Sequence, residues 1–408
     1  MIQLKNVAIG LVCALLLGAA YAADAPKGPQ ISRSIAKEII AAQKALQANQ
    51  FAEGIKNLTA AEAISPLTAF DHKTIDELKA FAYIKTNDYK SAQHSYEDAL
   101  NTGAANAEET SRYSRAVFSI AISTQQYTKA IEFGKKLVDS GNATGDIYMA
   151  ITQSYYLQKD CKDTVVWVDK SISFARVAHE TPKENLYLFK LQCAFDNNDN
   201  PGTIAALEDL VRLNGKTDYW NKLLRLERQD ERDDRSLLMI YRVMFSTGSM
   251  TASSDYLEMA QLLGDAGLPG EAQAVVQKDL DMGLVAADGK DRANRLLNSV
   301  KTRADTDRKN LVQFEGEASR AATGDLDVKL GEVYYGFGDY QNAVNAISRG
   351  IQKGQIKRPE EAYVYLGLAQ NNLKNAAEAR KAFAQLKSVP NISPRVLKLW
   401  NLYAERLG

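Results

Sequence analysis

Few side chains in this chain have the type and spacing needed for catalysis or metal binding. The three histidines, His72, His94 and His179, lie too far apart in the sequence to form a metal-ligand pair. The acidic stretch at residues 230–234 lacks the alternating carboxylates and central glycine of a calcium-binding loop. We find no glycine-rich phosphate loop, no zinc-protease motif and no nucleophile elbow. The sequence therefore predicts no catalytic residue, no bound metal and no cofactor.

The first residues have the order of a secretory signal peptide. Lys5 precedes an apolar run at residues 7–17, and small side chains lead up to Ala22, as a signal peptidase requires. The run is too short to span a bilayer comfortably, although a retained N-terminal anchor is the alternative. We therefore expect a signal peptide at residues 1–22, cleaved after Ala22, a short linker at 23–34, and export to the periplasm.

The charge of the chain argues against two classes of partner. Its 50 basic residues are balanced by 50 acidic residues, so no basic excess is available for a phosphate backbone. No second apolar stretch is long enough for a membrane span. We expect neither a nucleic-acid partner nor an integral membrane segment once the signal peptide is removed.

Internal repeats organise the rest of the chain. In the clearest copy, Leu330 and Tyr334 lie one turn apart on a first helix, and Gly338 permits a tight turn. Ala343 is small, so that a second helix can approach the first closely. This pattern resembles the tetratricopeptide repeat, and its marker residues are Leu330, Gly331, Tyr334, Gly338, Asp339, Tyr340, Ala343 and Ile347.

Further copies follow the same spacing. Most are separated by 34–39 residues, close to the family's period of about 34. The resemblance implies an all-α fold, an α-α superhelix built as a tetratricopeptide-like solenoid of about nine helix pairs with a C-terminal capping helix. The small residues of the successive second helices are Gly54, Ala92, Ala130, Thr164, Thr203, Ala272, Ala343 and Ala379.

The repeat pattern weakens in the middle of the chain without losing its helical character. One helix pair is expected around the charged turn at residues 227–235, and another around Asp305 and Asp307. Ser393 and Pro394 are expected to open the capping helix, as an N-cap and a proline at the first helical position. Three segments are therefore expected: an N-terminal array at 35–212, divergent helical repeats at 213–323, and C-terminal repeats with the capping helix at 324–408.

The repeat register also brings together the two cysteines that follow the leader. Cys161 falls at the start of the second helix of one repeat, and Cys193 lies late in the first helix of the next. The two helices are expected to be antiparallel neighbours, and an exported chain meets an oxidising compartment. A disulfide would close a loop of about 32 residues and contribute roughly 3–4 kcal/mol. Two separately buried thiols are the alternative.

The resemblance implies a partner-binding groove on the inner surface of the first helices. Glutamine or glutamate recurs in equivalent positions, where such side chains can pair with the backbone of an extended peptide. The alternative is that these polar side chains only keep the inner surface soluble and bind no partner. The expected groove residues are Phe81, Arg115, Gln153, Tyr156, Gln192, Phe195, Gln261, Glu332, Tyr335 and Asn371.

These features predict a binding protein rather than an enzyme. The leading hypothesis is a periplasmic scaffold or adaptor that binds a peptide or an envelope protein in its groove. The alternative is a non-catalytic regulatory subunit of an envelope enzyme or of a transport or secretion complex, such as TonB-type energy transduction or polysaccharide export. In that case the divergent segment at 213–323 would be the contact surface.

Overall fold

A computed structural model describes residues 29–407, apart from positions 230 and 391. This part contains twenty α-helices and two short 3-10 helices, and none of its residues forms a strand. The all-α architecture expected from the repeats is confirmed. The predicted signal peptide at residues 1–22 lies outside the described residues.

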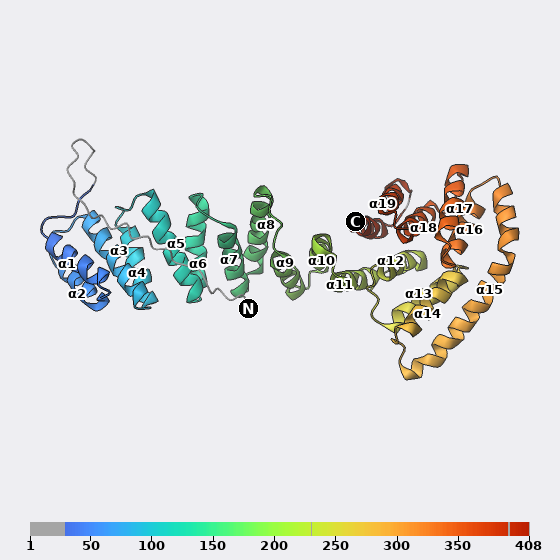
Figure 1. The fold of residues 1–408 in the computed structure, drawn as a ribbon, viewed down its shortest axis with the longest axis horizontal. Coiled ribbons are helices and arrows are strands. Elements are labelled where there is room, and N and C mark those ends of the chain that lie inside the picture. Colours follow the sequence, from blue (N-terminus) through green and yellow to red (C-terminus); the bar gives the residue numbers. More distant parts are fainter. Residues whose placement is uncertain (1–28, 230, 391, 408) are drawn as a thin grey trace. The chain divides into compact units, whose positions relative to one another are not determined.

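The chain divides into two compact units, one ending at Cys193 and one starting at Ala194. In unit 1, helices α1 to α8 stand side by side in chain order (Figure 1). The three-segment division drawn from the sequence stays a prediction. The helices up to the division are α1 (Ala36–Gln47), α2 (Phe51–Glu62), α3 (Ala69–Lys85), α4 (Tyr89–Asn101), α5 (Ala107–Ser123), α6 (Tyr127–Asp139), α7 (Gly145–Leu157), α8 (Cys161–Val177) and α9 (Glu184–Asp196).

Unit 2 contains the remaining helices. It includes the segment expected to hold the C-terminal repeats. It also includes the capping helix, which begins at Pro394 as the sequence predicts. Its helices are α10 (Asn200–Asn214), α11 (Thr217–Gln229), α12 (Asp234–Ser246), α13 (Ser253–Asp265), α14 (Pro269–Asp281), α15 (Lys290–Arg320), α16 (Asp325–Gly336), α17 (Tyr340–Lys353), α18 (Pro359–Asn372), α19 (Ala376–Ala384) and α20 (Pro394–Glu405).

The turn inside most helix pairs has one recurring backbone form. One turn residue takes a positive φ between 54° and 77°. The next residue donates its amide to the carbonyl five positions earlier, as Asp88 does to Tyr83 at 2.9 Å. This is the Schellman ending of a helix, which asparagine and glycine tolerate best. The positive-φ residues of these turns are Asn49, Asn87, Gln125, Lys159, Asn198, Gly267, Gly338 and Lys374.

Two features of the second helices shape each pair: an N-cap at the start of the helix and a small residue where it crosses the first helix. Aspartate caps several of these helices; Asp88, for example, accepts the amide of Ser91 at 3.1 Å. Close approach of the two helices leaves little space, because a Cβ added at Gly331 would lie 2.3 Å from Cγ1 of Ile347. The register expected from the sequence is confirmed, since the small residues are all buried: Gly54, Ala92, Ala130, Thr164, Thr203, Ala272, Ala343 and Ala379.

Cys161 and Cys193 are joined by a disulfide within unit 1. Cys161 is the first residue of α8, and Cys193 lies in the last turn of α9. Their Cα atoms are 5.3 Å apart. This separation meets the geometric requirement for a bridge, which is a Cα–Cα distance below about 7 Å.

The middle of the chain departs from the expected pattern at α15. The helix pair predicted around Asp305 and Asp307 is wrong, because α15 is one continuous helix of 31 residues. No glycine or proline occurs between Lys290 and Glu315, so nothing in the sequence breaks the helix there. The pair predicted around residues 227–235 is present as α11 and α12.

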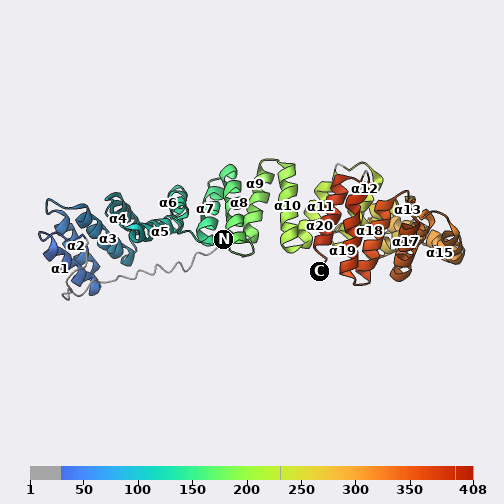
Figure 2. The same ribbon diagram turned by 90° about the horizontal axis from the view of Figure 1, so that it is seen from above.

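The last helix of unit 2 packs back on the helices that open this unit. Helix α20 contacts α10 and α12 as well as α19, and Figure 2 shows it beside α11. Lys398 Nζ lies 2.6 Å from Glu208 Oε1, and Arg395 Nε lies 3.0 Å from Glu227 Oε2. Unit 2 therefore closes on itself through residues almost two hundred positions apart.

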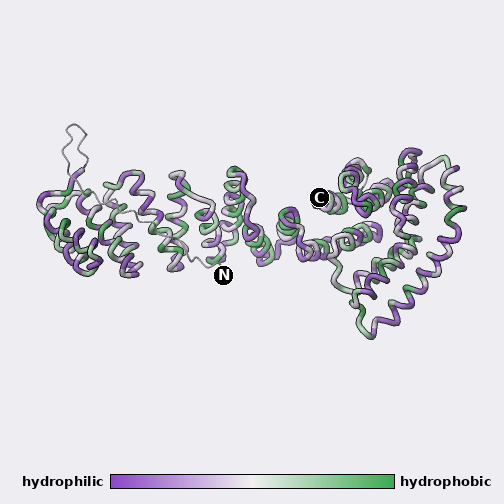
Figure 3. Tube along the Cα trace, viewed as in Figure 1, coloured by the Kyte–Doolittle hydropathy of each residue, from purple (hydrophilic) through white to green (hydrophobic). Residues whose placement is uncertain are grey.

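Apolar residues are spread along the helices rather than gathered in one long run. Figure 3 shows hydrophobic and hydrophilic positions alternating along the helices of both units. Among the described residues, no helix combines the length and the apolar character that crossing a membrane requires.

Candidate functional site: the first-helix row of unit 1

We use the name first-helix row for α3, α5, α7 and α9, the first helices of four successive pairs. Side chains join neighbouring members of the row. Lys73 on α3 pairs with Glu109 on α5 at 2.6 Å, and the rings of Tyr156 on α7 and Phe189 on α9 lie 4.6 Å apart. These contacts join α3 to α5 and α7 to α9.

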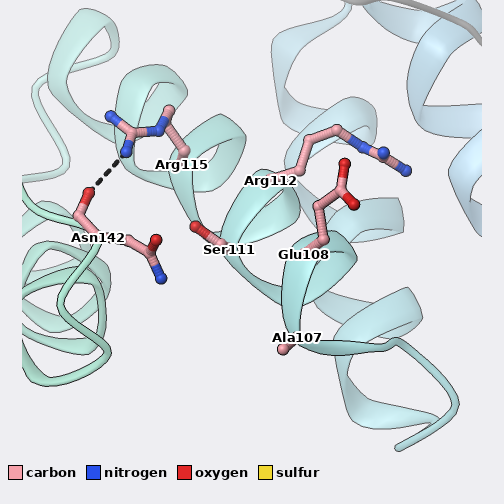
Figure 4. Close-up of a pocket in the computed structure, with 6 residues that line it drawn as sticks. All are labelled: Ala107, Glu108, Ser111, Arg112, Arg115 and Asn142. Carbon is pink, nitrogen blue, oxygen red and sulfur yellow. Dashed lines mark hydrogen bonds between the residues drawn. The ribbon is translucent and has the colours of Figure 1, made fainter.

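A hollow of about 460 Å³ opens on α5 (Figure 4). Arg115 reaches across it and donates a hydrogen bond from Nη2 to the carbonyl of Asn142 at 2.6 Å. In Figure 4, Arg112 extends in the opposite direction, above Glu108. The hollow is lined by Ala107, Glu108, Ser111, Arg112, Arg115 and Asn142.

The two arginines of this hollow differ in their electrostatic partners. Nη2 of Arg112 lies 2.5 Å from Oε1 of Glu77, on the neighbouring helix α3. Partial burial acts to lower the pKa of Arg112, but the charge of Glu77 raises it overall. Arg115 is exposed, and its hydrogen bond goes to a neutral carbonyl. Arg115 thus carries the positive charge that a partner's acidic group can reach.

The predicted groove residues of α3 to α9 lie at accessible positions. Phe81 is half-buried with its ring centroid 6.5 Å from that of Phe51. Gln153 is half-buried, and Gln192 is exposed. Phe195, at the end of α9, is 68% exposed, which is unusual for a large aromatic side chain.

The predicted groove residues of α13 to α18 are placed differently. Gln261 is exposed and donates to the carboxylate of Asp265 on its own helix. Asn371 donates to Oη of Tyr403 at 3.2 Å. Glu332 is only 3% exposed, and Tyr335 packs against Tyr340 and Tyr365. The expectation that Glu332 lines an open groove is therefore corrected, because Glu332 is an interior residue; Tyr335 is half-buried.

Burial changes the chemistry of Glu332. Lys329 Nζ lies 3.2 Å from its carboxylate. Removal from water outweighs this cation and raises the pKa of Glu332 to about 7. A half-protonated interior carboxyl group is a poor match for the peptide-binding role expected from the sequence.

The interior of unit 2 contains a cluster of buried polar side chains that the sequence did not reveal. Arg242 on α12 makes two hydrogen bonds to Glu271 on α14, at 3.2 and 3.3 Å. Tyr365 on α18 donates its hydroxyl to Glu271 at 2.5 Å and accepts from Arg242. All three come from different helices, so no local spacing links them. The cluster joins the start of unit 2 to its C-terminal repeats.

Metal binding has no candidate among residues 29–407 when positions 230 and 391 are left aside. No group of three or more histidine, cysteine, aspartate or glutamate side chains there is arranged to hold an ion.

Comparison with known proteins matches one family model, described as tetratricopeptide repeat, over residues 361–391. This segment includes α19 and nearly all of α18. No curated protein has a significantly matching sequence.

Several solved structures resemble the chain in fold. The TPR2AB domain of yeast Sti1, in a pHSP90 complex, is 14% identical, with a TM-score of 0.34 over 65% of this chain and 98% of that one. The C-terminal part of a repeat protein from Cytophaga hutchinsonii is 14% identical, with a TM-score of 0.28 over 88% and 97%. A tetratricopeptide repeat protein from Parabacteroides merdae is 11% identical, with a TM-score of 0.22 over 81% and 98%. Such distant likenesses carry no argument about function.

Proposed function

Because the chain is a tetratricopeptide-repeat protein, we propose that it is an exported scaffold that binds an extended segment of an envelope protein. Tetratricopeptide repeats generally mediate contacts between proteins. The proposed docking surface is the first-helix row of unit 1. The proposal assigns no chemical reaction to the chain.

The observation that carries this proposal is the accessibility of polar side chains along the first-helix row. Arg115, Gln153 and Gln192 keep part or all of their side-chain surface accessible in unit 1. The corresponding residue Glu332 in unit 2 is buried. A protein partner needs exposed donors, acceptors and apolar groups, which unit 1 offers along successive helices.

The docking surface is tested by recovering partners from an envelope extract after chemical cross-linking. Gln153→Ala combined with Gln192→Ala should reduce the recovered partner at least fivefold, because two backbone-pairing side chains are lost. Gln277→Ala, at an exposed position of the second helix α14 in unit 2, is the matched control and should leave recovery unchanged. Equal recovery by the double variant would move the site away from the first-helix row.

Two observations support the proposed periplasmic location. The order of residues 1–22 is that of a signal peptide, and Cys161 and Cys193 form a disulfide. Disulfides persist in oxidising compartments and are rare in the cytosol. A C-terminal fusion to alkaline phosphatase, which is active only after export, tests the location. An inactive fusion that becomes active with an established signal peptide in place of residues 1–22 would contradict it.

A second candidate function is a non-catalytic regulatory subunit of an envelope enzyme or transport complex. It is favoured by α15, whose side chains are exposed along most of its length and include Val312 at 84% exposure. If this function holds, Val312→Glu should lower recovery of an enzyme or transport subunit. The double glutamine variant of unit 1 should then recover that subunit normally.

A further inference from the structure

Two hollows lie in consecutive repeats of unit 1, at corresponding places. The first is the hollow on α5 described above. The second, of about 260 Å³, lies at the start of α7 and is lined by α8 and by the segment leading into α9. Asn142 borders the first hollow, and Thr144 borders the second, so the loop before α7 separates them. The two hollows are therefore neighbours on one surface.

Apolar residues of α7, α8 and α9 form one part of the second hollow, and polar residues, among them Ser171, Glu180 and Thr181, line the rest. Met149 and Phe174 are half-buried, and Leu186 is 3% exposed. At the edge, Lys183 and Asp146 pair at 2.9 Å. Because both of these side chains are largely exposed, their pairing is weak and can open for a ligand. The hollow is smaller than small-molecule pockets, which measure about 300–1,000 Å³, and its apolar part can take a single large apolar side chain.

The first hollow is complementary to a carboxylate. Arg112 is already paired with Glu77, whereas the hydrogen bond of Arg115 goes to a neutral carbonyl. An arginine can hold a carboxylate through two parallel hydrogen bonds. Glu108 on the same hollow disfavours deep insertion of an acidic group beside it. The reachable position for a carboxylate is thus next to Arg115, on the side facing the second hollow.

We infer that the two hollows together read an acidic and a large apolar side chain of one extended partner segment. Helices side by side are about 10–12 Å apart when their side chains are included. An extended chain rises about 3.3 Å per residue. The two recognised side chains are therefore three or four residues apart in the partner. This inference rests on the proposed docking role of unit 1 and specifies what unit 1 selects.

The test uses random peptides displayed on phage and selected on the purified, disulfide-bonded protein. Selected peptides should carry aspartate or glutamate three or four residues from leucine, isoleucine, methionine or phenylalanine. Arg115→Glu should weaken their binding at least tenfold, and selection on this variant should shift from acidic to basic residues. Met149→Trp should fill the second hollow and also weaken binding at least tenfold, with the acidic preference kept.

Lys162→Glu, a charge reversal on an exposed second-helix residue, is the matched control and should bind as the parent does. Melting curves of all variants should overlay, so that loss of binding is separated from loss of fold. Peptides without the paired residues, or unchanged binding by both hollow variants, would overturn the two-hollow inference and leave the scaffold proposal standing. If the parent protein selects no peptide at all, both proposals fail.

Discussion

Asp76 has a buried carboxyl group whose ionised form is disfavoured by its surroundings. It lies on α3 and is only 9% exposed. Burial, together with the negative charges of Asp98 and Glu62, raises its pKa to about 7, although the positive charges of Lys79 and His94 act in the opposite direction. At neutral pH the folded protein therefore holds this group near its midpoint of ionisation.

The raised pKa of Asp76 makes the stability of unit 1 depend on pH. The folded state binds the carboxyl proton of Asp76 more tightly than the unfolded state does. The stabilisation that this proton gives to the folded state is therefore fully present below about pH 4 and is lost as the pH rises through 7. Asp76→Asn should stabilise unit 1 at pH 8, by up to a few kcal/mol. The gain over the parent should be much smaller at pH 4.5.

Thermal melting at the two pH values measures this effect. Asp139→Asn, at an exposed position on α6, is the control and should shift neither melting temperature appreciably. A gain from Asp76→Asn that is the same at both pH values would show that packing, and not ionisation, is responsible.

At the scale of the helix pair, packing depends on small side chains at the crossing. Ala92 and Ala343 are both 0% exposed, one in each unit. Ala92→Trp or Ala343→Trp should lower the free energy of unfolding by roughly 1–3 kcal/mol or more, because the helices must separate to admit the ring. Denaturant unfolding measures the loss. Ala377→Trp, at an exposed position of α19, should cost little, and full stability of both buried variants would refute the pairing.

The continuity of α15 is a second property at the scale of the element. Thr306 is exposed in the middle of this helix, and its hydroxyl donates a hydrogen bond to the carbonyl of Thr302 in the preceding turn. Thr306→Pro should destabilise the helix by about 3 kcal/mol, because proline removes a backbone donor and clashes with the preceding turn. Hydrogen exchange should then rise on both sides of position 306.

Thr306→Ala serves as the control and should keep the exchange pattern of the parent. A proline that is tolerated without cost would instead support the turn that the acidic residues Asp305 and Asp307 suggested.

At the scale of the whole molecule, the interior of unit 2 contains a buried ion pair that links distant helices. Arg242 and Glu271 are both less than 10% exposed and satisfy each other together with Tyr365. Arg242→Ala should cost about 3–5 kcal/mol, because it leaves a buried carboxylate without its cation. Hydrogen exchange should increase from α12 to α18 and stay unchanged in α1 to α8.

The control for this prediction is Lys222→Ala, which removes an exposed ion pair with Asp218 on α11 and should have a small effect. Equal loss of protection in both units would mean that the chain unfolds as one body and that the division at Cys193 has no energetic counterpart.

The sequence by itself determined the features that depend on neighbours within one repeat. Ala92 and Ala343 could be assigned to the helix crossings because a small residue at a constant interval has one packing explanation. Cys161 and Cys193 could be paired because the repeat register places them in adjacent helices. In the candidate site, Arg115, Gln153 and Gln192 were assigned to the first helices in the same way.

Tertiary structure alone decided what depends on residues far apart in the chain. Glu332 follows the spacing of a groove residue, yet helices from other parts of unit 2 bury it. Arg242, Glu271 and Tyr365 meet across separations of 29, 94 and 123 residues, which no repeat pattern records. The physical reason is that helical periodicity specifies which face of a helix is apolar, whereas the path of the whole chain specifies what that face meets.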